Sequence, residues 1–150
     1  MQIIANNKKS YYQYHILEKF EVGIVLTGEE VKSLRVGKTS INEAFAETSG
    51  GELWLINSDI STYKNALKLK NIDPKRTRKL LARKKDISKM RGKIEKEGMT
   101  LVPLKLYFNQ RGLAKLEIAV AKGKKLFDKR QDKKKKDWNI QKRRLLKNIK

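Results

Sequence analysis

The sequence contains no cysteine and only one histidine among its 150 residues. Disulfide bonds are therefore excluded, and there are too few soft ligands for a zinc site, so we expect neither a metal nor a cofactor. The chain also lacks a run of about 18 apolar residues that could span a membrane, and it does not begin with the pattern of a cleavable signal. We therefore expect a cytoplasmic protein without a membrane partner.

Acidic residues are scarce relative to basic ones. The 16 Asp and Glu stand against 37 Lys and Arg, which gives a formal net charge of +21. A compact domain tolerates such a charge poorly unless an anionic partner neutralises it, and nucleic acid is the most common partner of this kind. The basic residues are concentrated in two blocks, 64–96 and 122–150, which alternate with two nearly neutral blocks.

Alternation of apolar and polar residues predicts β-strands in the neutral blocks. From Tyr12 to Leu26 the even positions are mostly apolar, which suits a long strand, or a bent strand pair, with one face buried. Similar patterns occur in GELWLIN, TLVPLKLYF and AKLEIAVA, with a weaker one in SINEAFAET. Pro103 should place its strand at a sheet edge or among the first paired residues, because proline cannot donate a ladder hydrogen bond. The NQRG segment at 109–112 predicts a hairpin turn.

Five or six short antiparallel strands predict a small closed or nearly closed barrel. A short helix is expected in TGEEVKSLRVG, where acidic residues occupy the first turn and Gly37 follows the last. A second helical segment is expected over 74–98, with Asp73 as N-cap, Pro74 in the first helical position and Gly98 at the end. Gly92 and the charges at 83–86 favour two helices with a break in this segment.

The second helical segment carries the first basic block. Its apolar residues should face the barrel, namely Leu80, Ile87, Met90 and Ile94. Its lysines and arginines should mostly point outward, namely Lys75, Arg76, Arg78, Lys79, Lys84, Lys85, Lys89 and Lys93. The alternative is an ordinary solvated helix face, but the few acids nearby leave little scope for pairing four residues apart on the helix.

The second basic block forms a C-terminal segment, so that the expected division is 1–121 for the barrel and 122–150 for a tail. The run of lysines at 133–136 would repel itself, so we expect the isolated tail to be extended or fluctuating. Trp138, Leu145 and Ile149 nevertheless fall on one stripe of a helix. We expect a segment that folds when a polyphosphate surface screens its charge; a solubilising tail and a terminal helix docked on the barrel are the alternatives.

Four segments together resemble the SsrA-binding protein family of bacteria, also called small protein B. They are GEEVKSLRVGK, DPKRTRKLLARKKDI, EGMTLVPLKLYF and VAKGKKLFDKR, in this order and at nearly the family's spacing. The resemblance covers Asn6 to about Lys147. It implies a mainly β fold, an antiparallel barrel of oligonucleotide-binding (OB) type with flanking α-helices and a basic C-terminal tail that is disordered until bound. It also implies binding to transfer-messenger RNA (tmRNA), which rescues stalled ribosomes by trans-translation.

The resemblance places four residues on the face that holds the tRNA-like domain of tmRNA: Asn7, Glu21, Leu81 and Lys115. The amide of Asn7 suits a base edge, although turn chemistry would also explain it. Glu21 could accept from base amino groups or fix a neighbouring arginine; otherwise it is an outward strand residue. Leu81 could pack on unstacked bases or belong to the core, and Lys115 could reach a phosphate.

Further cations are candidate phosphate contacts in this interpretation. Lys32 and Arg35 lie one turn apart in the first expected helix, where a capped surface helix would explain them nearly as well. The first basic block adds three more, Arg76, Arg78 and Lys79. We expect the barrel and these helices to hold the elbow of the tRNA-like domain.

The resemblance assigns the tail to the decoding centre and the empty mRNA channel of the stalled ribosome, in place of codon–anticodon pairing. The residues expected there are Lys124, Lys125, Phe127, Asp128, Lys129, Arg130, Lys133, Lys134, Lys135, Lys136, Trp138, Arg143 and Arg144. Phe127 departs from the His or Tyr that many family members carry, so stacking should persist without the polar group. The small-subunit rRNA is therefore an expected partner, and elongation factor Tu is expected in the delivery complex.

Two other functions remain to be compared with this one. A general RNA-binding or ribosomal protein with an OB-like barrel would fit the net charge equally well. A nuclease without His or Cys chemistry would need clustered carboxylates to hold metal ions. The dense acidic pair, Glu29 and Glu30, points about 100° apart on a helix, which makes a poor joint ligand. We therefore expect a protein that is not an enzyme.

Overall fold

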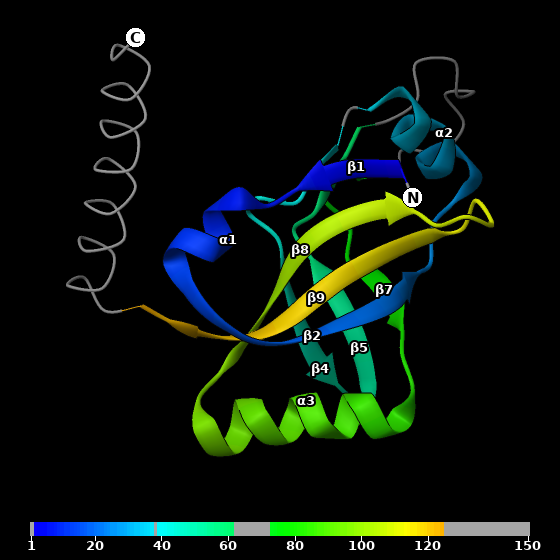
Figure 1. Cartoon of the computed structure of the whole chain (residues 1–150). Coiled ribbons are helices and arrows are strands. Elements are labelled where there is room, and N and C mark those ends of the chain that lie inside the picture. The colour runs from blue at the N-terminus through cyan, green and yellow to red at the C-terminus, as the bar shows by residue number, and fades with distance from the viewer. Residues whose placement is uncertain (1, 38, 62–72, 125–150) are drawn as a thin grey trace, which may run out of the picture.

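A closed β-barrel forms the body of the protein (Figure 1). The structure, a computed structural model, describes residues 2–37, 39–61 and 73–124. In these residues a seven-stranded antiparallel sheet has the order β1-β8-β4-β5-β7-β2-β9, and β8 also pairs with β9, which closes the barrel. The strands are β1 (Gln2–Asn6), β2 (Tyr14–Ile24), β4 (Phe45–Ser49), β5 (Glu52–Ile56), β7 (Arg78–Leu81), β8 (Thr100–Phe108) and β9 (Ala114–Gly123).

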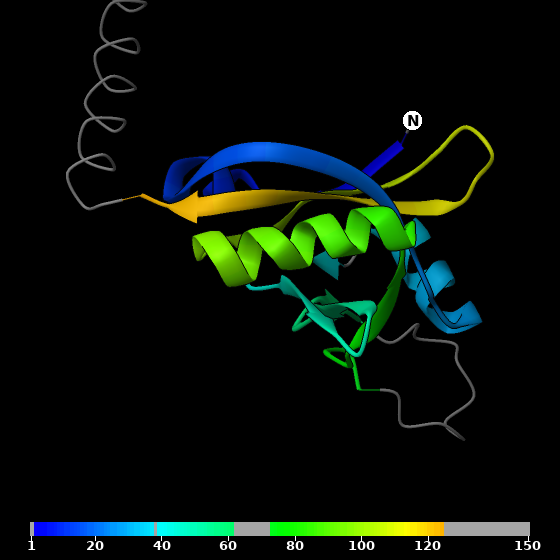
Figure 2. The same ribbon diagram turned by 90° about the horizontal axis from the view of Figure 1, so that it is seen from below.

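Three helices and a small second sheet complete the described part. The helices are α1 (Lys8–Gln13), α2 (Gly28–Val36) and α3 (Lys84–Glu97). The second sheet pairs β3 (Thr39–Ser40) with β6 (Asp59–Ile60). Figures 1 and 2 show α3 lying across one end of the barrel. The predicted mainly β barrel with short flanking helices is therefore confirmed.

Alternation along the strands fills the barrel with aliphatic side chains. On β9, Leu116, Ile118 and Val120 are at most 1% exposed, while Lys115 and Glu117 between them are half-buried. On β2 the even positions are also the more buried ones, as predicted. The expected strand began at Tyr12, but this residue belongs to α1, so the strand starts two residues later. The expected tail boundary at Lys122 falls inside β9, which pairs with β2 as far as Gly123.

The predicted helix over 74–98 is wrong in its first half. Residues 73–77 form a turn, in which Asp73 Oδ1 accepts a hydrogen bond from the Lys75 backbone at 2.9 Å, and the next residues form β7. Leu80 is buried as a strand residue, opposite Leu53 and Ile24. The helix begins only at Lys84 and runs through Gly92 as one helix, so the predicted break is wrong. Its end at Gly98, with φ 64°, is as predicted.

Pro103 does not mark an edge strand. It lies within β8, opposite Ile118 of β9, and a register shift follows between Pro103 and Lys105. A β-bulge is one of the few interior positions that tolerate a residue without an N–H. On its other side β8 pairs with β4 at Leu101 and with β1 from Lys105 onward, so Pro103 lies at the change of partner.

The N-terminus of α2 is fixed by a capping box. The Thr27 hydroxyl accepts from the Glu30 backbone N–H at 3.2 Å, and the Glu30 carboxylate accepts from the Thr27 N–H at 2.9 Å. Gly37 ends the helix in the left-handed region with φ 86°, where a side chain would be strained. The predicted start and end of this helix are confirmed.

Glu30 also binds two arginines that precede or begin β7. Arg78 donates through Nε to Glu30 at 2.7 Å and through Nη1 and Nη2 to Ser58 and to the carbonyl of Pro74. Arg76 donates to both carboxylate oxygens of Glu30. Arg78 is 0% exposed and Glu30 is 3% exposed, so the expectation that Arg78 points outward is wrong. Burial acts to raise the pKa of Glu30, but the hydrogen bonds from Arg76, Thr27 and Arg78 outweigh it and hold the pKa below its ordinary value.

Replacing Glu30 should destabilise the fold severely. Glu30→Ala leaves the Arg78 guanidinium buried without its counterion, so the free energy of unfolding should fall by about 3–5 kcal/mol. Chemical denaturation of the two proteins measures this difference. Glu29→Ala, in the same helical turn but outside the arginine cluster, should change it by less than about 0.5 kcal/mol. Equal losses for the two variants would contradict a role for the buried ion pairs.

Candidate nucleic-acid interface

A row of residues crosses four neighbouring strands on the barrel's outer face. Tyr107 of β8 lies opposite Lys115 of β9, Lys115 lies opposite Gly23 of β2, and Gly23 lies opposite Leu81 of β7. Because side chains alternate between the two faces of a sheet, Glu21 lies on the same face as Gly23, two residues along β2. The topology therefore brings Glu21, Leu81 and Lys115 together, although they are far apart in the sequence.

These three predicted residues line one open depression. Its other members are Gly23, Ala82, Arg83 and Asp86, the last two at the start of α3. Leu81 is 54% exposed, and an added Cβ on Gly23 would lie 3.3 Å from its Cβ. Glycine at this position therefore leaves the face of Leu81 uncovered. The depression combines an exposed aliphatic side chain with two cations and two carboxylates. The leucine suits contact with a base, the carboxylates can accept from base amino groups, and the cations suit a phosphate.

We define the outer surface formed by Glu21, Gly23, Leu81, Arg83 and Lys115 as the RNA face, after the prediction that Glu21, Leu81 and Lys115 contact RNA. Its carboxylate is held in place by the neighbouring tyrosine, since the Tyr107 hydroxyl donates a hydrogen bond to Glu21 Oε2. Tyr107 is 5% exposed, and burial followed by this hydrogen bond raises the pKa of its hydroxyl above the ordinary value of 10.0. Glu21 is thus an exposed acceptor with a fixed orientation. The residue that orients it by a hydrogen bond is a tyrosine rather than an arginine.

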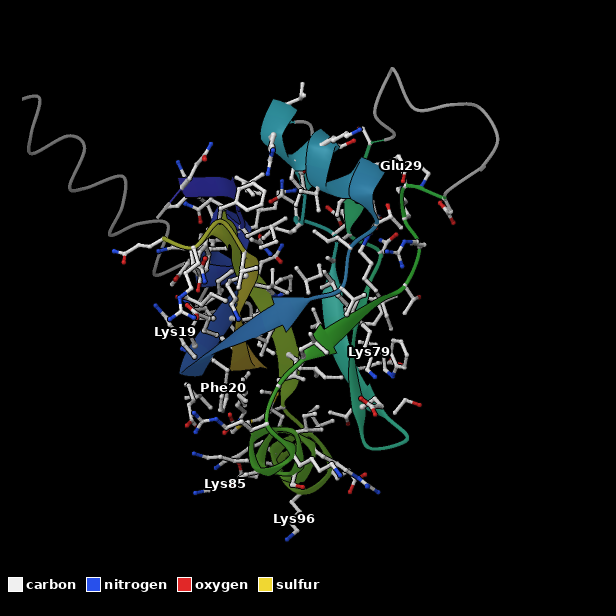
Figure 3. All side chains as sticks on the ribbon, turned by 90° about the vertical axis from the view of Figure 1, so that its right-hand side faces the viewer. Lys19, Phe20, Glu29, Lys79, Lys85 and Lys96 are labelled. Atoms are coloured by element: carbon white, nitrogen blue, oxygen red, sulfur yellow. The ribbon has the colours of Figure 1, made fainter. Side chains whose placement is uncertain are left out.

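Lys79, labelled in Figure 3, lies two residues before Leu81 in β7, so the two side chains share a side of the strand. It pairs with Glu52 at 3.4 Å. Lys32 and Arg35 are exposed on α2, and the Arg76 side chain is 30% exposed but bound to Glu30. None of these four cations is among the residues that line the depression.

Ion pairs neutralise much of the first basic block. Lys89 binds Glu18 at 2.7 Å, while Arg91 with Glu95 and Lys93 with Glu97 form pairs four residues apart. The expectation that acids were too few for pairing four residues apart is wrong on α3, where two such pairs form. Further partners come from other elements, namely Glu18, Glu30 and Glu52. Among the described residues of this block, the bases without an ion pair are Lys75, Arg83, Lys84, Lys85 and Lys96.

Two predicted RNA contacts are buried in the structure. Asn7 is 2% exposed, and its side-chain amide donates to the carbonyl of Pro103 at 2.9 Å and to that of Ile41 at 3.4 Å. Its backbone N–H donates to Leu104 at 2.8 Å, so Asn7 joins the chain to β8 where the strand changes partner. Arg78 is enclosed by Glu30, Ser58 and Pro74. Neither side chain is open to a nucleic acid in this structure, which corrects both expectations.

Three members of the site were not predicted from the sequence. The sequence indicated Tyr107 only as part of a strand and Arg83 only as part of a helical segment. It did not indicate Gly23 as a functional residue. Alternation in TLVPLKLYF, read backward from the turn at 109–112, would have placed Tyr107 beside Lys115.

Of the predicted tail residues, only Lys124 lies in the described part, where its N–H donates to Gln13 at 3.0 Å. The others, from Lys125 to Arg144, lie outside the described residues.

Comparison with known proteins decides the family. A family model described as SmpB protein matches residues 4–148. The chain belongs to the SmpB family. The SsrA-binding proteins of Rhodopseudomonas palustris TIE-1 and Allorhizobium ampelinum are 55% identical to this SmpB-family chain over 146 residues, which is 97% of this chain and 92% of each relative. The SsrA-binding protein of Rhizobium johnstonii is 53% identical, with 96% of that relative covered.

A solved structure extends this SmpB likeness to the fold. It comes from work on tmRNA–SmpB at the center of the bacterial ribosome. Its chain is 47% identical to this one and superposes with a TM-score of 0.66, covering 81% of this chain and 84% of the other. The fold and the family therefore agree.

The helices and the acidic side chains of the described residues bear on two other functions, membrane insertion and metal binding. Across 2–37, 39–61 and 73–124, every helix is too short or too polar to cross a membrane. In the same ranges, no group of three or more His, Cys, Asp or Glu side chains is arranged to hold a metal ion. The predicted acidic pair does not form a joint site either, because Glu30 is turned inward onto Arg76 and Arg78.

The Tyr107 hydroxyl should titrate above the ordinary tyrosine pKa of 10.0. Its raised pKa means that the fold favours the protonated form, so its contribution to stability is complete below about pH 10 and is lost as the pH rises through its pKa in the folded protein. Absorbance near 295 nm should show that the Tyr107 hydroxyl is still protonated at pH 11.5 in the folded protein. Tyr107→Phe should remove this late-titrating group, and guanidinium chloride should make all five tyrosines titrate together. A folded wild-type protein with five equivalent tyrosines would contradict the hydrogen bond to Glu21.

Proposed function

We propose that this chain binds the tRNA-like domain of tmRNA and delivers the RNA to stalled ribosomes for trans-translation. The observation that carries the proposal is membership of the SmpB family, together with the solved tmRNA–SmpB relative at 47% identity. The cytoplasm, where ribosomes work, is the compartment that this function requires. The protein acts as a binding partner that completes an RNA, and no bond is made or broken by it.

The RNA face supplies three kinds of contact that suit a folded RNA loop. Leu81 offers an aliphatic surface for an unstacked base, Glu21 offers a fixed acceptor for base amino groups, and Lys115 offers a cation for a phosphate. Lys79, on the same strand as Leu81, and the exposed Lys32 and Arg35 of α2 meet the RNA backbone outside this face. Arg76 takes part through its ion pair with Glu30, which holds β7 in place, rather than through phosphate.

The tail performs a separate task in this proposal. Its cations and Trp138 occupy the empty mRNA channel and the decoding centre, so that the complex acts only where no message lies. The support is the charge and the helical stripe in the sequence of 125–150. Elongation factor Tu belongs to the delivery complex in the same proposal, because a tRNA-like domain is brought to the ribosome as a tRNA is.

Substitutions on the RNA face should separate charge from shape. Lys115→Ala should weaken binding to the tRNA-like domain severalfold and reduce the slope of log affinity against log salt by about 1. Leu81→Ala should weaken binding by roughly tenfold and leave that slope unchanged, because no charge is lost. Fluorescence anisotropy at several salt concentrations measures both quantities.

Lys96→Ala is the matched control for this pair. Lys96 is exposed, has no ion pair among the described residues, and projects from the end of α3 away from the barrel (Figure 3). Its removal should leave the affinity within about twofold. A competing tRNA of ordinary sequence should bind far more weakly than the tRNA-like domain at the same salt. Equal binding of the two RNAs would favour a general RNA-binding protein instead.

Removing the tail should separate RNA binding from ribosome rescue. A chain that ends at Lys124 keeps all of β9 and its pairing with β2. It should bind the tRNA-like domain within about tenfold of the full-length affinity, because only the salt-dependent contribution of the tail is lost. It should fail to support tagging of peptides on ribosomes stalled at the end of a message without a stop codon. Normal tagging by the shortened chain would show that the tail is misassigned.

A further inference from the structure

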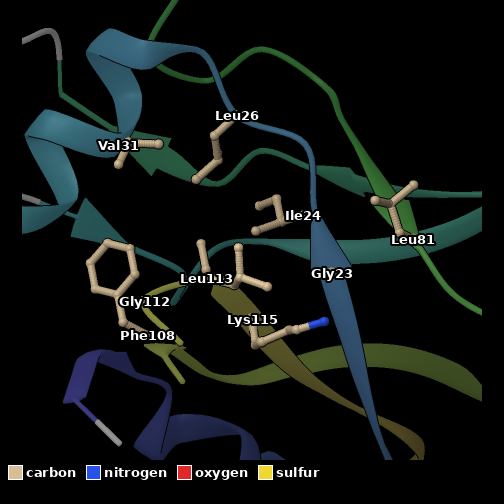
Figure 4. A pocket seen from close by; sticks show the side chains of 10 residues that line it. Gly23, Ile24, Leu26, Val31, Leu81, Phe108, Gly112, Leu113 and Lys115 are labelled. Carbon is tan, nitrogen blue, oxygen red and sulfur yellow. The ribbon is translucent and has the colours of Figure 1, made fainter. Parts of the chain in front are cut away.

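An apolar pocket opens beside the RNA face (Figure 4). It lies where the end of β2, the first turn of α2 and the β8–β9 hairpin meet, and it has a volume of about 280 Å³. Its walls are the side chains of Ile24, Leu26, Val31, Phe108, Leu113 and Ala114. None of the residues that line it carries a carboxylate, whereas the adjoining depression is lined by two, Glu21 and Asp86.

The pocket is continuous with the RNA face. Gly23, Leu81 and Lys115 line both hollows, so a ligand that covers the face reaches the pocket without a gap. Figure 4 shows Val31 and Phe108 on one side of the pocket and Leu81 on the other, with Lys115 extending toward Gly23. The lysine therefore lies at the boundary, where it can meet the phosphate of a nucleotide whose base is inside.

The pocket has an exposed apolar rim. Leu81 and Leu113 stand at its edges, and each is 54% exposed, whereas Ile24 and Phe108 at its base are 8% and 7% exposed. Two large aliphatic side chains left in water beside a concave apolar surface are typical of a binding site.

The wall that carries Leu113 is held rigidly. Asn109 Oδ1 accepts from the backbone N–H groups of Arg111 and Leu113 at 3.0 and 2.9 Å. The Asn109 N–H donates to the Leu113 carbonyl at 2.9 Å, and Gly112 adopts φ 75°, which this turn requires. The hairpin is therefore ordered before binding, so little entropy is lost when a ligand enters.

We propose that this pocket receives one unstacked nucleobase of the tRNA-like domain, gripped between Leu81 and Leu113, while Lys115 binds the phosphate of the same nucleotide. This inference rests on the proposed function and names an additional subsite for it. A single base suits the pocket because its flat faces are apolar while its polar edge can remain at the open mouth. A longer apolar ligand would extend past the rim onto the charged face.

Two substitutions test the pocket in opposite ways. Ala114→Leu fills it with a side chain, and Leu113→Ser removes one side of the rim. Each should lower the affinity for the tRNA-like domain by roughly tenfold, the usual loss for one stacked base. Phe45→Ser is the matched control, because Phe45 is an apolar side chain, 42% exposed, on β4 across the barrel from the pocket. It should change the affinity by less than about twofold.

Thermal unfolding identifies any variant that fails to fold. If Ala114→Leu does not fold, the affinity of Leu113→Ser, a surface change, tests the pocket alone.

An abasic scan of the RNA gives the sharper test. Each unpaired nucleotide of the tRNA-like domain is replaced in turn by one without a base, and the affinity of every RNA is measured with wild-type chain and with Leu113→Ser. One position should lose roughly tenfold in affinity with the wild-type chain and almost nothing with the variant, since the contact is already gone. The same position should be protected from base-modifying reagents only in the wild-type complex.

The outcomes are distinct. Coupling confined to one nucleotide supports the subsite. Additive losses at every position, with wild-type affinity for the pocket variants, show that the pocket is only part of the packing and overturn the inference while the proposed function stands. If the wild-type chain does not prefer the tRNA-like domain to ordinary tRNA, the proposed function fails, and the subsite fails with it.

Discussion

The position of the RNA face depends on the carboxylate of Glu30. This residue lies in the first turn of α2, which follows β2 after a short connection, and the two arginines that bind it lead into β7. The contact therefore fixes the end of one strand of the face against the start of the next. Leu81 lies three residues beyond Arg78, so any shift of Arg78 would move the leucine away from Gly23. Because the ions are buried, they cannot exchange one partner for water without a large loss of stability.

The same contact explains why two strong cations are unavailable to RNA. A buried arginine whose donors are directed to Glu30, Ser58 and Pro74 has none left for a phosphate. Arg78 stands among several other Lys and Arg residues in the sequence, so its position alone suggested a surface cation. Its partner is 48 residues away, which no local pattern indicates. The net charge of the chain thus overstates the charge that this block offers to a partner.

Alternation predicted β2 and the first half of β9 because these stretches have one face toward the core and one more open to water, although Ala119 and Ala121 later in β9 are buried as well. It failed between 74 and 83 for a definite reason. Leu80 and Ile87 are seven residues apart, a spacing that suits one helix and also suits a strand followed by a helix. Only pairing with Leu53 and Ile24 decides between them, and that information is not local.

The candidate site was also predictable only in part, because some of its contacts join residues that are far apart in the sequence. Glu21, Leu81 and Lys115 came from a resemblance, and the topology then brought them onto one face. Asn7 was taken for a base contact because its amide suits one. Its amide instead reaches the carbonyl of Pro103, 96 residues along the chain, where β8 changes partner and leaves an acceptor unpaired. A buried carbonyl needs such a donor, and the need is visible only in the folded barrel.

Binding by this chain separates into two contributions. Cations such as Lys115 and the lysines of the tail act through phosphate, and this contribution weakens as salt replaces the counterions that binding released. Leu81, the apolar pocket and the acceptor on Glu21 act through the shape and edges of bases, which salt hardly weakens. Every RNA presents phosphates, whereas only a loop with a suitably extruded base presents the second kind of contact. The distinction between tmRNA and other RNAs therefore has to arise on the barrel, and rising salt should reduce affinity for all RNAs while preserving the preference among them.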